Sequence, residues 1–112
     1  MAEITIRAAP GTWVVRTGDA VLGETTAALE LFEGDLKPVV YFPRGDIAMA
    51  FLEPSDHRTT CPWKGEAAHF HISTPEGMIE NAAWSYETPI EGVARIKGHI
   101  AFYASKATVE QL

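Results

Sequence analysis

The chain has 112 residues, 46% of them hydrophobic and 21% charged, and its formal net charge at pH 7 is −6. This size and composition exclude several domains and global disorder and fit one soluble domain, while the negative charge disfavours a nucleic-acid partner. No apolar run is long enough to span a membrane and Cys61 is the only cysteine, so we expect no membrane partner, no intramolecular disulfide and a cytoplasmic location.

The first predicted elements are short strands, because glycines and prolines recur between brief apolar stretches. Residues 13–16 and 20–23 flank Gly18, which can take the positive φ of a tight turn, so we expect them to form a hairpin. Residues 27–33 carry a mixed pattern, and their short length before Gly34 favours a strand over a helix.

Two further strands are predicted on either side of residues 43–46. Residues 39–42 are β-branched and aromatic, and residues 47–52 form a continuous apolar run. Because the Pro-Arg-Gly-Asp sequence between them is typical of a turn, we expect the two strands to pair. The Pro-Ser-Asp sequence at residues 54–56 is expected to end the second strand.

An alternation with a period of two predicts a strand over residues 67–72, with His69 and His71 on one face. Two imidazoles at this spacing can bind one metal ion, but a zinc site needs more protein ligands, and nothing in the sequence brings His57 or His99 nearby. We therefore expect solvated strand histidines and no metal; a metal site is the alternative.

The last part of the chain is predicted to contain one helical turn and two strands. Residues 75–77 have turn chemistry, and residues 79–86 tolerate a single helical turn. Alternating apolar residues predict a long strand over residues 95–102, and a short one follows at residues 107–109. The predicted fold class is mainly β: one small domain, residues 1–112, of antiparallel strands and hairpins with one or two short helical turns.

The most unusual stretch for chemistry is Cys61-Pro62-Trp63-Lys64-Gly65. Pro62 restricts Cys61 to an extended backbone, and Gly65 can adopt backbone angles that other residues avoid. We therefore expect the loop to have one defined shape. A cation such as Lys64 would favour the thiolate of Cys61, which is the nucleophilic form of a cysteine. The alternative is inert packing, because free cysteine is among the most buried residue types.

The turn after residues 39–42 offers a second set of polar side chains. Arg44 could hold an anionic ligand and Asp46 could orient a proton, or Asp46 bonds to its own turn and Arg44 is solvated. Trp84 and Tyr86 add ring area, which either walls a pocket or belongs to the core.

Three functions compete on these residues. The first is binding of a small, perhaps anionic, ligand in an aromatic-lined pocket, and its predicted residues are Tyr41, Arg44, Trp63, Lys64, Trp84 and Tyr86. The second is an enzyme with Cys61 as the catalytic nucleophile, Lys64 beside it and Asp46 positioning a proton. The third is a protein-interaction module, or a homodimer formed along a free sheet edge.

Four short motifs follow one another along the chain. They are Tyr41-Phe42-Pro43 with Asp46, Cys61-Pro62-Trp63-Lys64-Gly65 with Ala67, Trp84-Ser85-Tyr86 with Pro89, and Gly98 before Phe102-Tyr103. In this order, within residues 13–109, they resemble the bacterial domain of unknown function 427 family. The resemblance implies a small, mainly β domain, of the tent-like type found in methionine sulfoxide reductase B and the cereblon ligand-binding domain.

The resemblance implies no cofactor for this chain. Several tent-like domains hold zinc through paired Cys-x-x-C motifs, which this sequence lacks. A nucleotidyltransferase label is sometimes attached to the family, but such enzymes need clustered carboxylates to hold magnesium beside the phosphates. Asp46, Glu30 and Glu33 are not an obvious set of this kind, so we expect no nucleotidyl transfer.

Overall fold

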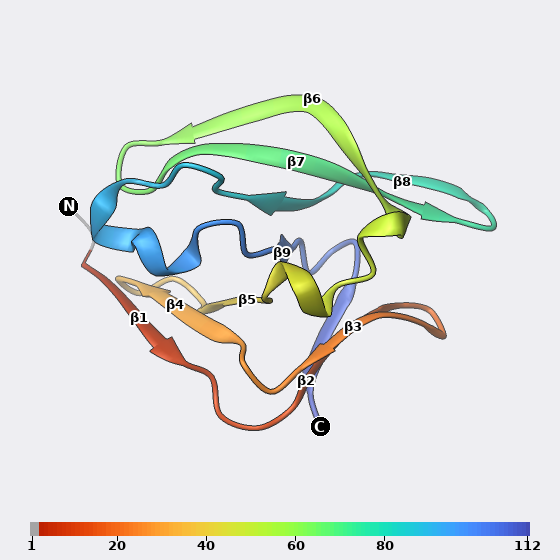
Figure 1. The fold of residues 1–112 in the computed structure, drawn as a ribbon, viewed down its shortest axis with the longest axis horizontal. Coiled ribbons are helices and arrows are strands. Elements are labelled where there is room, and N and C mark those ends of the chain that lie inside the picture. Colours follow the sequence, from red (N-terminus) through yellow and green to blue (C-terminus); the bar gives the residue numbers. More distant parts are fainter. Residues whose placement is uncertain (1–2) are drawn as a thin grey trace.

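The computed structural model describes residues 3–112 and contains three antiparallel sheets (Figure 1). The first sheet has the order β1–β4–β5, with β1 at Ile4–Ala8, β4 at Leu29–Glu33 and β5 at Val39–Tyr41. The second has the order β10–β2–β3, with β2 at Trp13–Thr17, β3 at Ala20–Thr25 and β10 at Thr108–Gln111. The third has the order β6–β7–β8–β9, with β6 at Leu52–Cys61, β7 at Gly65–Thr74, β8 at Gly77–Ser85 and β9 at Ala101–Phe102.

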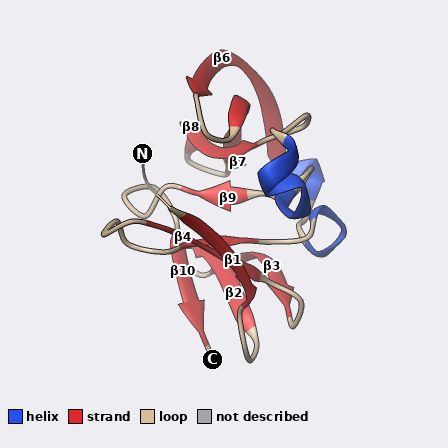
Figure 2. Ribbon diagram, turned by 90° about the vertical axis from the view of Figure 1, so that its left-hand side faces the viewer, coloured by secondary structure: helices blue, strands red, loops and turns tan. Residues whose placement is uncertain are grey.

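The helical parts are 3-10 turns in the connections between strands (Figure 2). They are η1 at Arg44–Asp46, η2 at Met49–Phe51 and η3 at Glu91–Ile96. None of the helices in residues 3–112 has the length and apolar character needed to cross a bilayer. The predicted fold class, mainly β with short helical turns, is confirmed, and the tent-like architecture stays a prediction.

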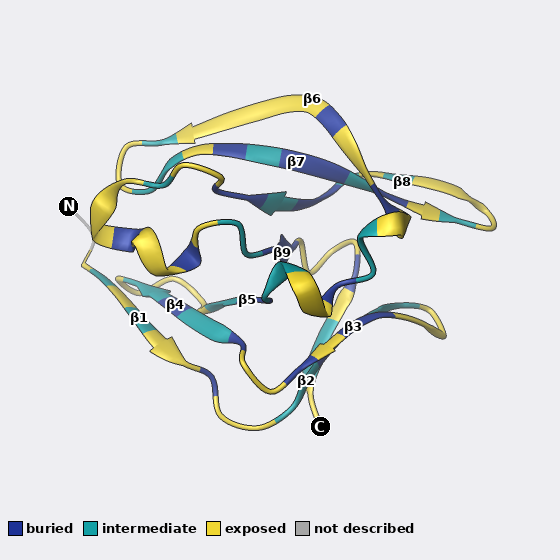
Figure 3. Ribbon diagram, in the orientation of Figure 1, coloured by how far each residue is buried: buried dark blue, intermediate teal, exposed yellow. Residues whose placement is uncertain are grey.

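The third sheet covers the other two sheets. In both ribbon views β6, β7 and β8 form one layer, and β9 lies between that layer and the strands of the first two sheets. An isolated bridge between Phe42 and Ile100 ties the end of β5 to the segment before β9. β6 is mainly exposed, whereas most residues of β7 are buried or half-buried, as expected for an edge strand and an inner strand (Figure 3).

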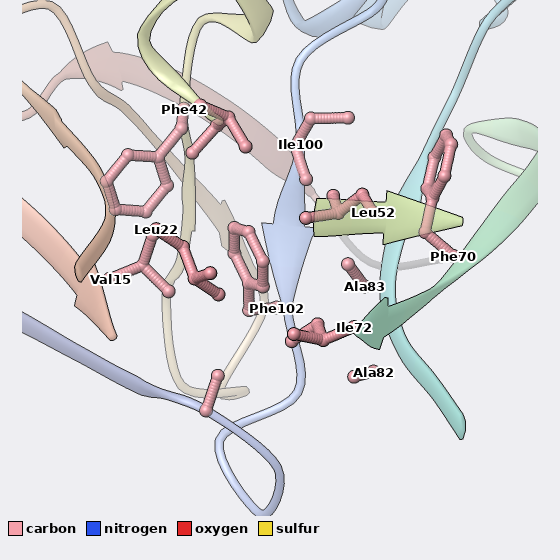
Figure 4. Close-up of a cluster of buried hydrophobic side chains, with 12 residues drawn as sticks. Val15, Leu22, Phe42, Leu52, Phe70, Ile72, Ala82, Ala83, Ile100 and Phe102 are labelled. Carbon is pink, nitrogen blue, oxygen red and sulfur yellow. The ribbon is translucent and has the colours of Figure 1, made fainter. Parts of the chain in front are cut away.

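Two clusters of buried side chains fill the space between the layers. In the larger cluster the rings of Phe42 and Phe102 meet edge to face, with centroids 6.0 Å apart, and aliphatic side chains from the second and third sheets surround them (Figure 4). The second cluster contains Leu31, Tyr41, Ala67, Tyr86, Val93, Ile96 and Ala101. This second cluster supports the candidate site.

Several predicted elements are confirmed. Residues 13–16 and 20–23 lie in the hairpin of β2 and β3, and the strand predicted within residues 27–33 is β4. Residues 67–72 lie within β7, which ends in the predicted turn before β8. The strand predicted at residues 107–109 is β10, shifted by one or two residues.

The predicted pairing of residues 39–42 with residues 47–52 is wrong. β5 pairs with β4, while Ile47 forms a bridge with Gly23 and η2 follows it. A Cβ atom at Gly23 would lie 2.7 Å from the backbone oxygen of Asp46, so this close approach requires glycine. The apolar run is thus accommodated by contacts with β3 rather than by strand pairing.

Residues 54–56 do not end a strand either, because β6 continues through Pro54 as far as Cys61. Proline removes a hydrogen-bond donor, which is tolerated on an edge strand or at a bulge. β6 is an edge strand, and its register with β7 shifts between Pro54 and Arg58.

The helical turn predicted in residues 79–86 and the long strand predicted over residues 95–102 are also wrong. The first segment is mostly β8, where pairing with β7 and β9 overrides the helix propensity of Ala82 and Ala83. In the second segment Gly98 has a φ of 71°, and backbone hydrogen bonds curl the chain on either side of it. Only the two residues of β9 remain extended there.

Candidate functional site

A hollow of about 180 Å³ opens between the first and third sheets. Four aromatic side chains line it: Tyr41 from β5, Trp84 from β8, Tyr86 just after β8 and Tyr103 just after β9. The Trp84 ring stands edge to face against Tyr41, at 6.2 Å between centroids, and lies 4.5 Å from the ring of Tyr103. Three of the predicted aromatic residues, Tyr41, Trp84 and Tyr86, therefore meet in one place, and the predicted Lys64 joins them.

Lys64 and Glu33 form an ion pair in the wall of the hollow. Nζ of Lys64 lies 2.5 Å from Oε1 of Glu33, and the two side chains are only 12% and 16% exposed. Lys64 belongs to the β6–β7 turn and Glu33 ends β4, so the pair connects the two sheets. Lys37, on the loop after β4, also lines the hollow. Within residues 3–112, the one carboxylate and two ammonium groups of the lining sum to a formal charge of +1.

The phenols of the hollow are hydrogen-bond donors over the physiological pH range. Burial raises the pKa of Tyr41 far above its usual value, although the hydrogen bond from Trp84 opposes this rise. Burial, with Cys61 and Glu33 nearby, raises the pKa of Tyr86 to about 12. Since Trp84 Nε1 donates to Tyr41 Oη at 3.2 Å, the Tyr41 hydroxyl keeps its own proton for another partner.

Tyr103 connects the hollow to a buried histidine. Its hydroxyl lies 3.0 Å from Nε2 of His69, and the two rings are nearly parallel, with 14° between their planes. Burial lowers the pKa of His69, and the neighbouring His57 lowers it further, so the ring is neutral at physiological pH. The prediction of a solvated His69 is wrong: it is 1% exposed, because the rings of Tyr103 and His57 pack against it.

Cys61 lies next to the hollow but outside its lining. It is half-buried, packs against the second cluster, and is paired with Gly65 across the tight β6–β7 turn. The backbone N–H of Lys64 donates to the Cys61 carbonyl at 3.2 Å, which fixes this turn. Trp63, at the tip of the turn, is 40% exposed and also lies outside the lining.

A comparison with known protein families matches residues 5–111 to the family described as a domain of unknown function, DUF427. The chain belongs to the DUF427 family. The resemblance carried by the four sequence motifs is thereby confirmed. A comparison with curated proteins gives no match.

Two predicted site residues of this DUF427 domain, Arg44 and Asp46, lie outside the lining of the hollow. The Arg44 guanidinium donates to the Glu87 carboxylate at 2.7 and 2.8 Å and to the Gly98 carbonyl at 3.0 Å. Asp46 Oδ2 accepts a hydrogen bond from Thr25 Oγ1 at 2.8 Å. Both side chains thus connect η1 to other parts of the fold, and the structure does not bring them to Lys64.

Three further residues that line the DUF427 hollow, Tyr103, Glu33 and Lys37, were not predicted from the sequence as site residues. Tyr103 belongs to the last motif, which was its only signal. Glu33 and Lys37 flank a turn, where charged residues are ordinarily solvated, so nothing local marked them. The position of Glu33 becomes informative only once β4 is seen to lie opposite the β6–β7 turn.

The histidines of this DUF427 domain are spread over different environments. His71 Nδ1 accepts a hydrogen bond from the Asn81 backbone N–H at 3.0 Å, and the rings of His57 and His69 meet edge to face with 4.6 Å between their centroids. In the part of the chain that the structure describes, no three histidine, cysteine or acidic side chains converge as a metal site would require.

Proposed function

We propose that this DUF427 domain binds a compact, ring-shaped ligand with one acidic group in the hollow between β5 and β8. The single observation that carries this proposal is the convergence of four aromatic rings and a lysine on one concave site. Sites for small molecules characteristically combine aromatic walls with a few polar groups that fix orientation.

The polar groups favour a ligand that accepts hydrogen bonds. Lys64 offers an ammonium group, and Tyr41 and Tyr86 offer hydroxyl donors that stay protonated. Among the described residues that line the hollow, Glu33 is the one acidic group, and its carboxylate is already paired with Lys64. A carboxylate on the ligand would match this excess of donors and the positive formal charge of the lining.

The size of the hollow limits the ligand to about one ring. An apolar cavity of about 150 Å³ accepts benzene, and this hollow has about 180 Å³. A ligand of about nine non-hydrogen atoms is expected to bind weakly, with a Kd between about 10 μM and several millimolar.

The proposal is tested by following the three tryptophan indole N–H signals in ¹⁵N-edited NMR spectra while benzoate is added. Trp84 Nε1 bonds to Tyr41 in the wall, whereas Trp13 and Trp63 lie outside the lining and serve as internal controls. We expect a saturable shift of the Trp84 signal alone. Uncharged benzamide should bind less tightly, and benzylammonium least.

A paired substitution separates charge recognition from stability. Lys64→Met alone would leave the Glu33 carboxylate buried without its partner, so Lys64→Met is combined with Glu33→Gln. The double variant should weaken benzoate binding about tenfold, or about 1.4 kcal/mol, and leave benzamide binding unchanged. No Trp84 shift with any of the three compounds at 10 mM would refute the proposal.

A second candidate function, catalysis by Cys61, is favoured by one contact only. The Cys61 side chain packs against the cluster that contains Tyr41 and Tyr86, so it adjoins the proposed binding site. If Cys61 is a nucleophile, iodoacetamide should modify it faster in the folded protein than in urea, and benzoate should slow the reaction. Slower modification in the folded protein would exclude this candidate.

A further inference from the structure

A second, larger concave surface lies between the tips of two hairpins. Residues 17–22 of the β2–β3 hairpin form one wall, residues 73–79 of the β7–β8 hairpin form the other, and Phe51 of η2 lies between them. Its volume is about 910 Å³, about five times that of the aromatic hollow. Figure 1 shows both hairpins projecting from the same side of the molecule, and we call the surface between them the hairpin groove.

The hairpin groove carries unusually exposed apolar side chains. Val21 is 57% exposed, Phe51 51% and Met78 44%, and one comes from each of the three segments. Apolar side chains gathered in a concave surface in this way are typical of a contact site for a partner.

The strands that border the groove have unpaired edges. β3 is the outer strand of its sheet, and only its inner part is covered, by the bridge from Gly23 to Ile47. β9 pairs with β8 only at Ala83 and Trp84, and the Tyr103 N–H and Lys106 Nζ bond to the next outer carbonyls, those of Ala82 and Glu80. Among residues 3–112 no strand covers the first residues of β8, near Met78. An extended peptide can pair with such a short free edge over a few residues through its backbone.

Charge decides which partner the groove favours. Asp19 and Glu76 stand on the two opposing turns, and the described residues that line the groove include no lysine or arginine. A second copy of this chain, with a net charge of −6, would bring like charges together. A basic segment with apolar side chains would instead meet opposite charge at both rims and apolar surface in the middle.

We propose that the hairpin groove binds an extended peptide in which apolar and basic residues alternate. Because successive side chains of a strand point to opposite faces, the apolar ones enter the groove beside Phe51 and Met78. The basic ones lie outward, near Asp19 and Glu76. This surface is separate from the aromatic hollow, so the inference does not depend on the ligand proposed there.

The test is an NMR titration of the full chain with a blocked octapeptide of alternating lysine and valine. We expect backbone amide shifts confined to the two hairpin tips and Phe51. Two matched peptides resolve the contributions: alternating glutamate and valine should bind at least tenfold more weakly, and so should alternating lysine and serine. Equal binding of the lysine–serine peptide would overturn the proposal, because it would indicate unspecific attraction to an acidic protein.

Variants locate the site. Phe51→Ser combined with Met78→Ser should weaken binding of the lysine–valine peptide at least tenfold, and both side chains are exposed enough for the fold to tolerate the change. Leu36→Ser is the matched control, because Leu36 is 66% exposed but lies at the aromatic hollow. Unchanged binding by the double variant, or groove shifts that grow with protein concentration before any peptide is added, would overturn the proposal, the latter in favour of a second copy.

Discussion

At the scale of single residues, the pair of Lys64 and Glu33 is the most consequential contact of the aromatic hollow. It is shielded from solvent and lies beside Tyr41 and Tyr86, where an unpaired carboxylate would be costly. The ammonium group holds the two sheets together, and in the proposed function it also offers positive charge to a ligand.

Removing one partner of this pair should destabilise the protein more than removing both. We expect Lys64→Met to lower the free energy of unfolding by about 2 kcal/mol, because Glu33 is left buried and unpaired. Lys64→Met with Glu33→Gln should recover at least half of that loss. Urea unfolding measures both, and equal losses in the two variants would mean that the pair is not effectively buried.

His69 should make stability depend on pH. Its pKa is lowered by burial in the folded protein, whereas the unfolded chain takes up a proton near pH 6.5. Between these two values the unfolded state binds more protons, so the free energy of unfolding falls as the pH drops below about 6.5.

The sign of this effect can be checked with urea unfolding at pH 7.5 and pH 5.5. His69→Phe keeps a ring against Tyr103 and His57 but does not titrate, and it should reduce the difference between the two measurements. An undiminished difference in this variant would assign the pH dependence to other groups.

At the scale of elements, close approaches between backbone segments decide whether an apolar run becomes a strand, which the sequence pattern alone does not. β3 and the segment after η1 approach so closely at Gly23 that a side chain would not fit. The pattern of a short apolar run such as residues 47–52 is equally compatible with a strand and with another buried segment, and only this tertiary contact distinguishes the two structures.

The close approach predicts a contrast between two glycines. Gly23→Ala should destabilise the protein by about 2 kcal/mol, because its Cβ would overlap the Asp46 backbone. Gly45→Ala is the matched control, since a Cβ there meets nothing within 4 Å, and it should change stability by less than about 0.5 kcal/mol. Thermal unfolding compares the two, and equal effects would contradict the packing described for η1.

Periodicity and turn chemistry predicted the hairpin of β2 and β3 and the long strand β7, because both signals are local. They failed where pairing partners decide the outcome, as in β8 and residues 95–102. The residues of the aromatic hollow, like the strands, were predictable from the sequence only in part. Residue type marked Tyr41, Lys64, Trp84 and Tyr86, but Glu33 comes from a strand far away along the chain, which only the assembled sheets bring opposite Lys64.

At the scale of the whole molecule, the domain measures 41 × 33 × 24 Å. The β6–β7 turn and β4, which border the aromatic hollow, lie toward one end of its long axis, and the two hairpin tips that border the hairpin groove lie toward the other (Figure 1). Each concave surface is bordered by elements from two different sheets. Ligands that bridge sheets bind the folded state only, so they should stabilise it against unfolding.

Benzoate at ten times its Kd should therefore raise the free energy of unfolding by about 1.4 kcal/mol. The alternating lysine and valine octapeptide should still bind with unchanged affinity in the presence of saturating benzoate, because the surfaces share no residue. Calorimetry in the presence of each ligand and of both measures this. Competition between them would show that the two surfaces are not independent sites.

The proposed function requires that Tyr41, Lys64, Trp84 and Tyr86 form a binding site for a compact acidic ring. The most direct measurement is a crystal structure with 4-bromobenzoate, located by the anomalous signal of bromine. The proposal predicts one dominant bromine peak between the rings of Trp84 and Tyr86, with the carboxylate at Lys64. A dominant peak elsewhere, with the hollow empty at saturating concentration, would contradict it.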